Sequence, residues 1–393
     1  MLNVSHLLAD VASFGDRLRY TPRSVGQRHG THDGAGPVVV WNITRTCNLR
    51  CLHCYASSEN KKYDGELTTE EALAVIDDLA AARVPVILFS GGEPFVRPDI
   101  LDLARYAVEK GIHVTFSTNG TLIDEQLAKA IKAIGVGYVG ISLDGIGDVH
   151  DRFRRKKGAF DAALRGIRNC LNHGVKVGLR FTINRHNVDQ LEAIFNLIEE
   201  EGIQRACFYH LVYTGRASAG DDITPEETRA VLDSLFARVE DFARRGIQKE
   251  ILTVDNHADG VYLYLRMKEK DPAKAEAIYE KLRYAGGNRS GMAIANIDHR
   301  GFVHPDQFTP YVTVGNVRET PFSVLWRDNP HPMLEKLRNR KPLLTGRCAR
   351  CRFLDICNGN FRARAMAVHG DFWAEDPACF LTDEEILEGR QEN

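Results

Sequence analysis

The sequence predicts an α/β fold: a partial (βα)6 TIM-like barrel, followed by a C-terminal domain that carries four cysteines. Short apolar, β-rich runs alternate with segments of helical period between residues 38 and 211. The predicted strands are almost continuously apolar, which is typical of parallel strands covered on both faces by helices. Because a (βα) barrel carries its chemistry at the carboxyl ends of its strands, we searched those positions for functional residues.

The elements of the barrel follow in order from Val38. The first strand is Val38–Thr44, and the helix after it is predicted over 69–82. Thr68 or Thr69 suits its N-cap, and Glu70 and Glu71 suit the positive N-terminal end. The remaining elements are strand 86–89, helix 98–110, strand 114–117, helix 124–134, strand 138–143, helix 159–173, strand 176–183, helix 188–201 and strand 206–211.

Three further parts flank this barrel of residues 38–211. Residues 1–37 are expected to be an N-terminal extension, with an amphipathic helix within 1–20 and a loop rich in Gly, Pro, His and Arg over 21–37. Residues 212–285 are expected to be a helical bridging region, with helices over 225–245 and 272–284 and a strand-like segment at 251–254. Residues 286–393 form the C-terminal domain, with a hairpin over 291–305.

Composition excludes several classes of protein. A net charge of −2 argues against nucleic-acid binding driven by bulk electrostatics. No apolar run approaches the roughly 20 residues of a membrane span, and the N-terminal segment lacks the pattern of a signal peptide. Seven of the nine cysteines fall in two spaced groups, which indicates metal ligands in a reducing compartment. We therefore expect a cytoplasmic protein with oxygen-sensitive metal sites.

The first group is Cys47, Cys51 and Cys54, directly after the first predicted strand. Cys thiolates are the usual ligands of iron–sulfur clusters. Three thiolates leave one iron of a [4Fe–4S] cubane open for a ligand from outside the protein, as a catalytic metal site requires. Half of a zinc site is the alternative, but zinc requires four ligands, and His53 would strain the loop as the fourth. The segment therefore predicts a [4Fe–4S] cluster.

This C-x3-C-x2-C motif after a first β-strand resembles the radical S-adenosylmethionine (SAM) enzymes. The resemblance implies that SAM chelates the open iron through its amino and carboxylate groups. It also implies that an electron from the cluster splits SAM and releases a 5′-deoxyadenosyl radical. The family commonly has a large aromatic residue before the third cysteine. Here His53 takes that position, and its ring still offers a flat face toward the adenine.

The resemblance extends to the ends of the later strands. The Gly–Gly–Glu–Pro sequence after the second strand resembles the motif that holds the SAM ammonium group, although alone it would predict a plain turn. Polar residues after the third and fourth strands resemble contacts to SAM. A buried arginine in the fifth suits the SAM carboxylate, with a salt bridge to a strand neighbour as the alternative. The SAM-binding residues implied in this way are Gly91, Gly92, Glu93, Ser117, Asn119, Ser142, Asp144 and Arg180.

The second group is Cys348, Cys351, Cys357 and Cys379. Four cysteines are also the count of a closed zinc site, which is the alternative here. Beside a radical SAM barrel, their spacing resembles the auxiliary-cluster domain of the SPASM/twitch branch, and implies a second [4Fe–4S] cluster ligated wholly by protein. The hairpin over 291–305 lacks cysteines, so one auxiliary cluster is expected and not two. The two remaining cysteines, Cys170 and Cys207, are expected in the core.

The tail from Cys351 to Ala365, with residues 374–379 and His304, resembles the tetrapyrrole-modifying branch of the family. That branch contains two sibling reactions on didecarboxysirohaem. One removes two acetate side chains and gives iron-coproporphyrin III in the sirohaem-dependent haem route. The other removes propionates on the way to haem d1. Residues 358–365 and the N-terminal segment LRYTPRSVGQRH favour the first. A SPASM-type peptide-modifying enzyme stays open, as does a non-enzymatic iron–sulfur or haem carrier, which would leave the SAM motifs unexplained.

A tetrapyrrole with several carboxylates requires cationic partners, and Arg pairs bidentately with carboxylates. Arg362 and Arg364 follow the third tail cysteine closely, so a role in fixing the cluster loop is the equal alternative to a clamp on the substrate. Histidines near the mouth suit the haem iron. The resemblance further implies a reduced flavodoxin- or ferredoxin-type electron donor. The candidate substrate residues are Arg362, Arg364, His304, His210, Arg23 and Arg28.

Overall fold

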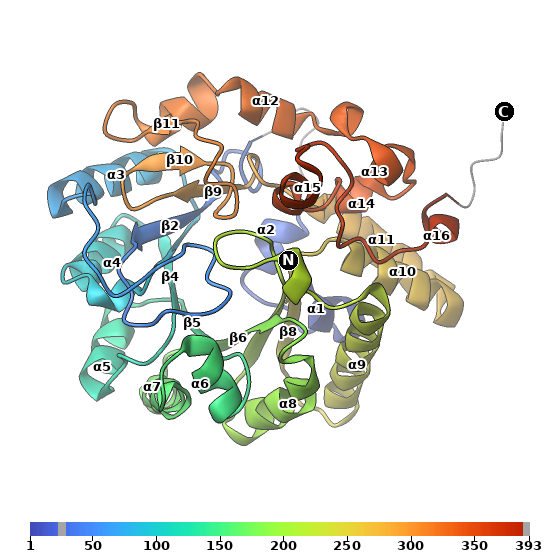
Figure 1. The fold of residues 1–393 in the computed structure, drawn as a ribbon, viewed down its shortest axis with the longest axis horizontal. Helices are drawn as coiled ribbons and strands as arrows, with labels where there is room; N and C mark the ends of the chain where they lie inside the picture. Colours follow the sequence, from blue (N-terminus) through green and yellow to red (C-terminus); the bar gives the residue numbers. More distant parts are fainter. Residues whose placement is uncertain (23–28, 388–393) are drawn as a thin grey trace.

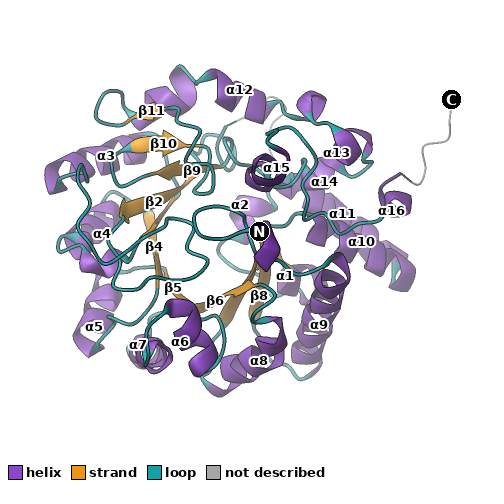
Figure 2. Ribbon diagram, viewed as in Figure 1, coloured by secondary structure: helices purple, strands orange, loops and turns teal. Residues whose placement is uncertain are grey.

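The computed structural model describes residues 1–22 and 29–387. Within these residues one sheet of 11 strands has the order β1-β8-β7-β6-β5-β4-β3-β2-β9-β10-β11. Figure 1 shows the sheet curving around the centre of the molecule, with helices outside it. Figure 2 shows the same layers, with orange strands inside and purple helices around them. Arg23 and Arg28, expected as substrate residues, lie outside the described residues.

The six strands predicted for the barrel are all present and pair in parallel, each with the next along the chain. Their apolar side chains are buried, as expected for strands covered on both faces. The predicted fold class, a partial (βα)6 TIM-like barrel, is confirmed. The strands are β2 (Val38–Thr44), β3 (Val86–Gly91), β4 (His113–Thr118), β5 (Tyr138–Ser142), β6 (Val177–Ile183) and β7 (Arg205–His210).

Five of the connecting helices lie close to their predicted ranges, and α6 (Asp148–Arg154) is an additional helix that was not predicted. Thr68 is the N-cap of the first, and its side chain and that of Glu71 form a capping box. The second begins at Ile100, two residues later than predicted, because Asp99 takes the N-cap position after Pro98. The helices are α3 (Thr69–Ala81), α4 (Ile100–Glu109), α5 (Glu125–Ile134), α6 (Asp148–Arg154), α7 (Ala159–Asn172) and α8 (Leu191–Glu200).

One edge of the sheet extends beyond the predicted barrel. The strand-like segment in the bridging region is β8 (Glu250–Val254), which pairs in parallel with β7. The predicted amphipathic helix within residues 1–20 is wrong as a single element, because the chain begins with β1 (Leu2–Asn3), antiparallel to β8. Two short helices follow, α1 (Val4–Ala9) and α2 (Asp16–Arg19). Val4 and Leu7 of α1 are buried, so this segment belongs to the core.

The other edge is extended by the C-terminal part of the chain. The predicted hairpin is confirmed as β9 (Ile294–Ile297) and β10 (Phe302–His304), which are antiparallel. Strand β9 also pairs in parallel with β2, and β11 (Gly315–Asn316) follows β10. Because one sheet runs through all four expected parts of the chain, the four-part division stays a prediction.

The remaining helices complete the outer layer. Helix α14 packs against α10 and α11, which joins the cysteine-rich tail to the segment before it. No helix in residues 1–22 and 29–387 is long and apolar enough to cross a membrane. These helices are α9 (Pro225–Arg244), α10 (Ala258–Lys270), α11 (Pro272–Ala285), α12 (Pro332–Arg338), α13 (Gly346–Arg350), α14 (Leu354–Cys357), α15 (Arg362–His369) and α16 (Asp383–Leu387).

Candidate active site

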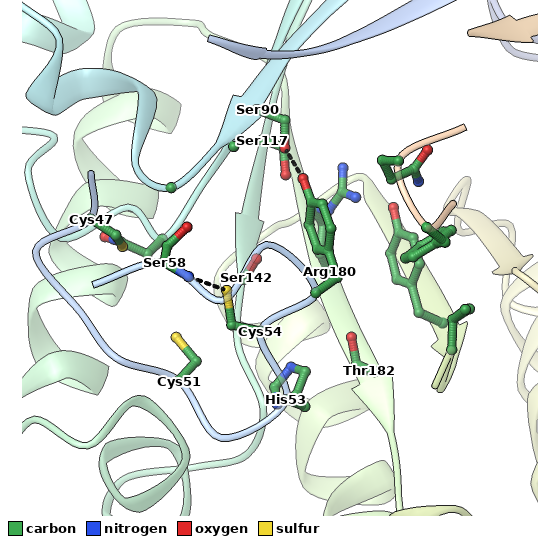
Figure 3. Close-up of a pocket in the computed structure, with 18 of the residues that line it drawn as sticks. Cys47, Cys51, His53, Cys54, Ser58, Ser90, Ser117, Ser142, Arg180 and Thr182 are labelled. Atoms are coloured by element: carbon green, nitrogen blue, oxygen red, sulfur yellow. Dashed lines mark hydrogen bonds between the residues drawn. The ribbon is translucent and has the colours of Figure 1, made fainter. Parts of the chain in front are cut away.

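One cavity lies where the strands β3 to β7 end, and the loop after β2 forms one of its walls (Figure 3). It brings together residues that are far apart in the sequence, as expected when parallel strands end at one edge of a sheet. The predicted residues that line it are Cys47, Cys51, Cys54, Gly91, Gly92, Ser117, Asn119, Ser142 and Arg180, together with His53 and His210. Two residues expected among the SAM contacts, Glu93 and Asp144, do not line it.

Each sulfur of the cysteine loop receives a hydrogen bond from an N–H group. The backbone N–H of Leu49 lies 3.4 Å from Cys47 Sγ, and that of Ser58 lies 3.5 Å from Cys54 Sγ. An Nη of Arg154 lies 3.3 Å from Cys51 Sγ. Burial, with smaller contributions from the charges of Glu93, Cys51 and Cys54, raises the pKa of the Cys47 thiol to about 12. N–H donors around clustered thiols suit an iron–sulfur cluster, whose sulfurs accept such bonds.

Asp144 supports this loop from outside the cavity. Its carboxylate pairs with Arg154 at 2.8 Å and lies 3.4 Å from Nε2 of His53. Burial raises the pKa of Asp144, but Arg154, His53 and His150 outweigh burial and hold this pKa below its usual value. The carboxylate is 1% exposed, so the expected contact between Asp144 and SAM is not what the geometry supports. Asp144 instead holds Arg154 against the sulfur of Cys51.

We expect this arginine to raise the reduction potential of a cluster held by the loop. A hydrogen bond to a charged group contributes about 1.5–3 kcal/mol, so its loss should lower a one-electron potential by roughly 60 to 130 mV. Because Arg154→Met alone would leave Asp144 buried without its partner, the change is made together with Asp144→Asn. The measurement is a redox titration followed by electron paramagnetic resonance.

The single variant Asp144→Asn is the control, since it retains Arg154 as the donor to Cys51 and keeps an amide oxygen that can accept from its guanidinium. Equal potentials in the double and single variants would show that Arg154 does not tune the cluster.

The Gly–Gly–Glu sequence forms the end of β3 and its turn. A Cβ atom at Gly91 would lie 2.2 Å from the carbonyl oxygen of Thr44, and one at Gly92 would lie 2.1 Å from that of Thr46. Only glycine fits at these two positions, because backbone oxygens cannot move aside as a side chain could. The two glycines therefore allow the turn to pack directly against the chain at the end of β2, beside the cysteine loop.

Glu93 is fully buried behind this turn. Its carboxylate accepts hydrogen bonds from Thr118 Oγ1 at 2.7 Å, from the backbone N–H of Asn119 at 2.8 Å and from that of Phe95 at 3.2 Å. Burial raises the pKa of Glu93 to about 7, against these three hydrogen bonds. Glu93 thus ties the end of β3 to the end of β4, and its carboxylate does not face the cavity. The expected direct contact with the SAM ammonium group is not supported by this geometry.

Asn119, at the end of β4, is placed beside the cysteine loop. Its Nδ2 donates to Asn48 Oδ1 at 2.8 Å and lies 3.9 Å from Cys47 Sγ. Ser117 and Ser142 are half-buried at the ends of β4 and β5 and line the same cavity (Figure 3). These three polar residues lie where the sequence places them.

Arg180 enters the cavity from the middle of β6 (Figure 3). Its guanidinium lies 4.7 Å from the ring centroid of Tyr209. Among the described residues, no Asp or Glu forms an ion pair with Arg180, and the ionisable groups that most affect its pKa after burial are Tyr209, Tyr138 and Cys207. The salt bridge to a strand neighbour, the alternative weighed for this residue, is therefore absent from the described chain. A half-buried cation in this position suits a carboxylate brought by a ligand.

The four tail cysteines also lie near one another. Burial raises the pKa of Cys357 well above its usual value, and the charges of Cys379, Cys348 and Cys351 raise it further. The backbone N–H of Phe353 lies 3.4 Å from Cys351 Sγ. In the described part of the chain, no three His, Cys, Asp or Glu side chains are arranged to hold a single metal ion. All nine cysteines are free, and Cys170 and Cys207 are buried as predicted.

The two tail arginines are engaged within the protein. Arg364 is 0% exposed and forms an ion pair with Asp376 at 2.9 Å. Its remaining N–H groups donate to the carbonyl oxygens of Leu211 and Asp255. Arg362 donates to the carbonyl oxygens of Gly359, Phe372 and Ala374 in the tail. Neither lines the cavity, so this geometry favours the role in fixing the cluster loop over the clamp on substrate carboxylates.

Of the two candidate histidines, one lines the cavity and the other does not. His304 is 3% exposed, its Nδ1 lies 2.9 Å from the carbonyl oxygen of Val312, and it does not line the cavity. The geometry does not support the expectation that His304 meets the substrate iron, because its ring contacts the segment that follows β10. His210, at the end of β7, does line the cavity.

The sequence analysis missed several residues of the site. Arg154 reaches Cys51 from α6, 103 positions further along the chain. Arg216 donates to the carbonyl oxygens of Cys51 at 2.7 Å and Ser58 at 3.1 Å, and braces the same loop. Tyr55 lies 2.9 Å from Ser90 Oγ, and Thr182 also lines the cavity (Figure 3). Tyr55 had a usable signal, since it directly follows the third cysteine.

A loop of three thiols, a glycine turn and polar strand ends around one cavity define a class of enzyme. The family model of the Radical SAM superfamily matches residues 41–198, which span β2 to α8. This chain belongs to the radical SAM superfamily of enzymes. Membership implies SAM and one [4Fe–4S] cluster as cofactors, and the residues around the cavity fit both.

Two relatives lie in the tetrapyrrole-modifying branch of that family. The chain is 50% identical over 396 residues to Fe-coproporphyrin III synthase of Methanosarcina barkeri, covering 98% of this chain and 99% of the relative. It is 45% identical over 350 residues to Pre-heme d1 synthase of Dinoroseobacter shibae, covering 88% and 86%. The resemblance to this branch is confirmed.

Among solved structures, SuiB of Streptococcus suis bound to S-adenosylmethionine superposes with a TM-score of 0.71. The match covers 88% of this chain and 78% of SuiB, at 17% identity. At this identity the likeness supports the fold alone. Because it covers 88% of this chain, the match extends beyond the six-stranded barrel of residues 38–211.

Proposed function

We propose that this enzyme converts didecarboxysirohaem to iron-coproporphyrin III by removing two acetate side chains, in the sirohaem-dependent haem route. The observation that carries the proposal is the 50% identity to Fe-coproporphyrin III synthase over nearly the full length of both chains. The identity to Pre-heme d1 synthase is lower and the match is shorter, so removal of propionates is the second candidate function. The N-terminal segment belongs to the match that favours the first reaction.

The cavity supplies the positions that such an enzyme requires. When bound, the first cluster and SAM supply a deoxyadenosyl radical that takes a hydrogen atom from the substrate. Cys47, Cys51 and Cys54 would hold the cluster, and Gly91 and Gly92 line the same cavity next to the cysteine loop, where a ligand of the cluster would lie. Arg180 would pair with a carboxylate of SAM, because no carboxylate of the described chain pairs with it.

We further propose that the four tail cysteines hold one auxiliary [4Fe–4S] cluster. Their mutual proximity and the N–H donor to Cys351 support this assignment. A reduced flavodoxin- or ferredoxin-type protein would supply electrons. Nine free cysteines, seven of them in metal-binding groups, suit a reducing compartment such as the cytoplasm.

Glu93→Ala should weaken SAM binding by at least about tenfold while the iron content stays unchanged. The effect on SAM is indirect. Without the carboxylate, the buried backbone N–H of Asn119 loses its hydrogen-bond partner, which costs about 1–3 kcal/mol. We expect Asn119, which lies beside Cys47, to shift and to disturb the SAM site. Equilibrium binding of SAM to anaerobically reconstituted protein measures the effect. Unchanged affinity would mean that Glu93 does not position the SAM site.

The proposal is tested by anaerobic incubation with didecarboxysirohaem, SAM and a reductant, with the products identified by mass spectrometry. We expect iron-coproporphyrin III with all propionates retained. A product that lacks propionates would replace the proposal by the haem d1 reaction. No conversion, together with SAM cleavage on a peptide, would favour a peptide-modifying enzyme instead.

A further inference from the structure

His210 stands out among the histidines that line the cavity. It is the last residue of β7, where its backbone pairs with Ile183 of β6, and it is 6% exposed. The cavity also contains His53, on the cysteine loop. Both side chains therefore stand at the mouth where the strands end, but their ring nitrogens have different surroundings.

One nitrogen of His210 is fixed by a buried carboxylate. Nε2 lies 2.9 Å from Oδ2 of Asp259, in the first turn of α10. Asp259 is 0% exposed, its Oδ1 has no hydrogen-bond partner among the described residues, and its Oδ2 is held by His210. An Asp that accepts from Nε2–H fixes the orientation of the ring and leaves the lone pair on Nδ1.

The other nitrogen of His210 is available to a ligand. Nδ1 makes no hydrogen bond within residues 1–22 and 29–387, and it is not among the buried atoms that lack a partner, so it keeps access to solvent. His53 is different, because its Nε2 faces Asp144 and its Nδ1 is buried. Of these two cavity histidines, His210 alone combines a fixed ring with an accessible nitrogen.

Histidines that bind a metal commonly have their second ring nitrogen held by a carboxylate. The carboxylate fixes the tautomer and makes the ligand nitrogen more basic. Among the described residues, His210 belongs to no group of three His, Cys, Asp or Glu side chains that could hold a metal ion, so the ring suits a metal that brings most of its own ligands. An iron tetrapyrrole supplies four nitrogens of its own and requires the protein for an axial position.

We propose that His210, oriented by Asp259, is the axial ligand to the iron of the tetrapyrrole substrate. This inference rests on the proposed function, since it assumes an iron tetrapyrrole in this cavity. The bond would fix the macrocycle at the end of β7 and set which side chains face the cysteine loop. Asp259 is then a positioning residue, which acts through His210.

The test uses the reconstituted enzyme and two probes, ferric iron-coproporphyrin III and metal-free coproporphyrin III. Binding is followed by difference absorption and by electron paramagnetic resonance of the haem iron. We expect a histidine-ligated haem spectrum with wild-type protein. His210→Ala should lose that spectrum and bind the iron porphyrin at least about tenfold more weakly, with unchanged binding of the metal-free porphyrin.

Two further variants separate ligation from packing. His210→Gly with added imidazole should regain the histidine-type spectrum, which a structural role would not produce. Asp259→Asn should keep the ligand but shift the spectrum and weaken binding of the iron porphyrin by roughly 10-fold or more. The matched control is His186→Ala, which removes an exposed histidine that pairs with Asp221 at the surface.

The failures of the two proposals are distinguishable. If His210→Ala keeps the wild-type spectrum and both affinities, the axial-ligand assignment is overturned and the proposed function stands. If wild-type protein binds neither porphyrin, the proposed function is overturned, and this inference with it.

Discussion

Replacing Cys47, Cys51 and Cys54 together by alanine should abolish SAM cleavage and halve the iron content. Two cubane clusters correspond to about eight irons in reconstituted wild-type protein, and the variant should keep about four. SAM cleavage stops because these three thiols line the cavity beside the glycine turn and would hold the cluster that reduces SAM. Iron analysis and chromatographic assay of 5′-deoxyadenosine measure the two effects.

Cys170→Ala is the control for this variant. Cys170 is a free, fully buried cysteine of α7 that does not line the cavity, so its loss should leave about eight irons and full SAM cleavage. Residual cleavage in the triple variant would mean that another site reduces SAM. Stoichiometric zinc in the tail would contradict the auxiliary cluster without affecting the first one.

Arg364→Met should destabilise the protein by about 3–5 kcal/mol, because it leaves the carboxylate of Asp376 buried without its partner. Asp376 also accepts from the backbone N–H groups of Phe361 and Ala378, next to Cys379. We therefore expect the variant to lose the auxiliary irons and to keep those of the first cluster. Denaturant unfolding and iron analysis measure the two effects.

Arg350→Ala removes an exposed arginine between Cys348 and Cys351 and is the matched control, with stability and iron content expected to stay unchanged. If Arg364→Met instead kept its stability and its irons and only raised the concentration of substrate required, Arg364 would be a substrate clamp. The complete burial of its side chain argues against that result.

The sequence was sufficient to predict the barrel and most of the cavity. The strands are nearly uniformly apolar, and polar residues stand where each one ends, so Ser117, Asn119 and Ser142 could be placed at one mouth before the fold was known. Three closely spaced cysteines define their own loop. These features are local, and local patterns are what a sequence shows directly.

Contacts between distant segments were beyond such patterns. Arg154 and Arg364 are both arginines near functional motifs, yet one supports Cys51 and the other is neutralised by Asp376. Only the packing of α6 and of the tail determines these partners. The two-residue strand β1 was missed because a strand this short has no periodicity, and its pairing with β8 depends on the finished sheet.

The central claim is that SAM cleavage in this cavity is coupled to the removal of acetate side chains. The most direct measurement is the number of 5′-deoxyadenosine molecules formed per molecule of porphyrin product, under anaerobic turnover of didecarboxysirohaem. Each lost side chain consumes one hydrogen abstraction, so the account predicts two 5′-deoxyadenosines for each iron-coproporphyrin III. SAM cleavage that proceeds at the same rate without the tetrapyrrole, with no porphyrin product, would contradict it.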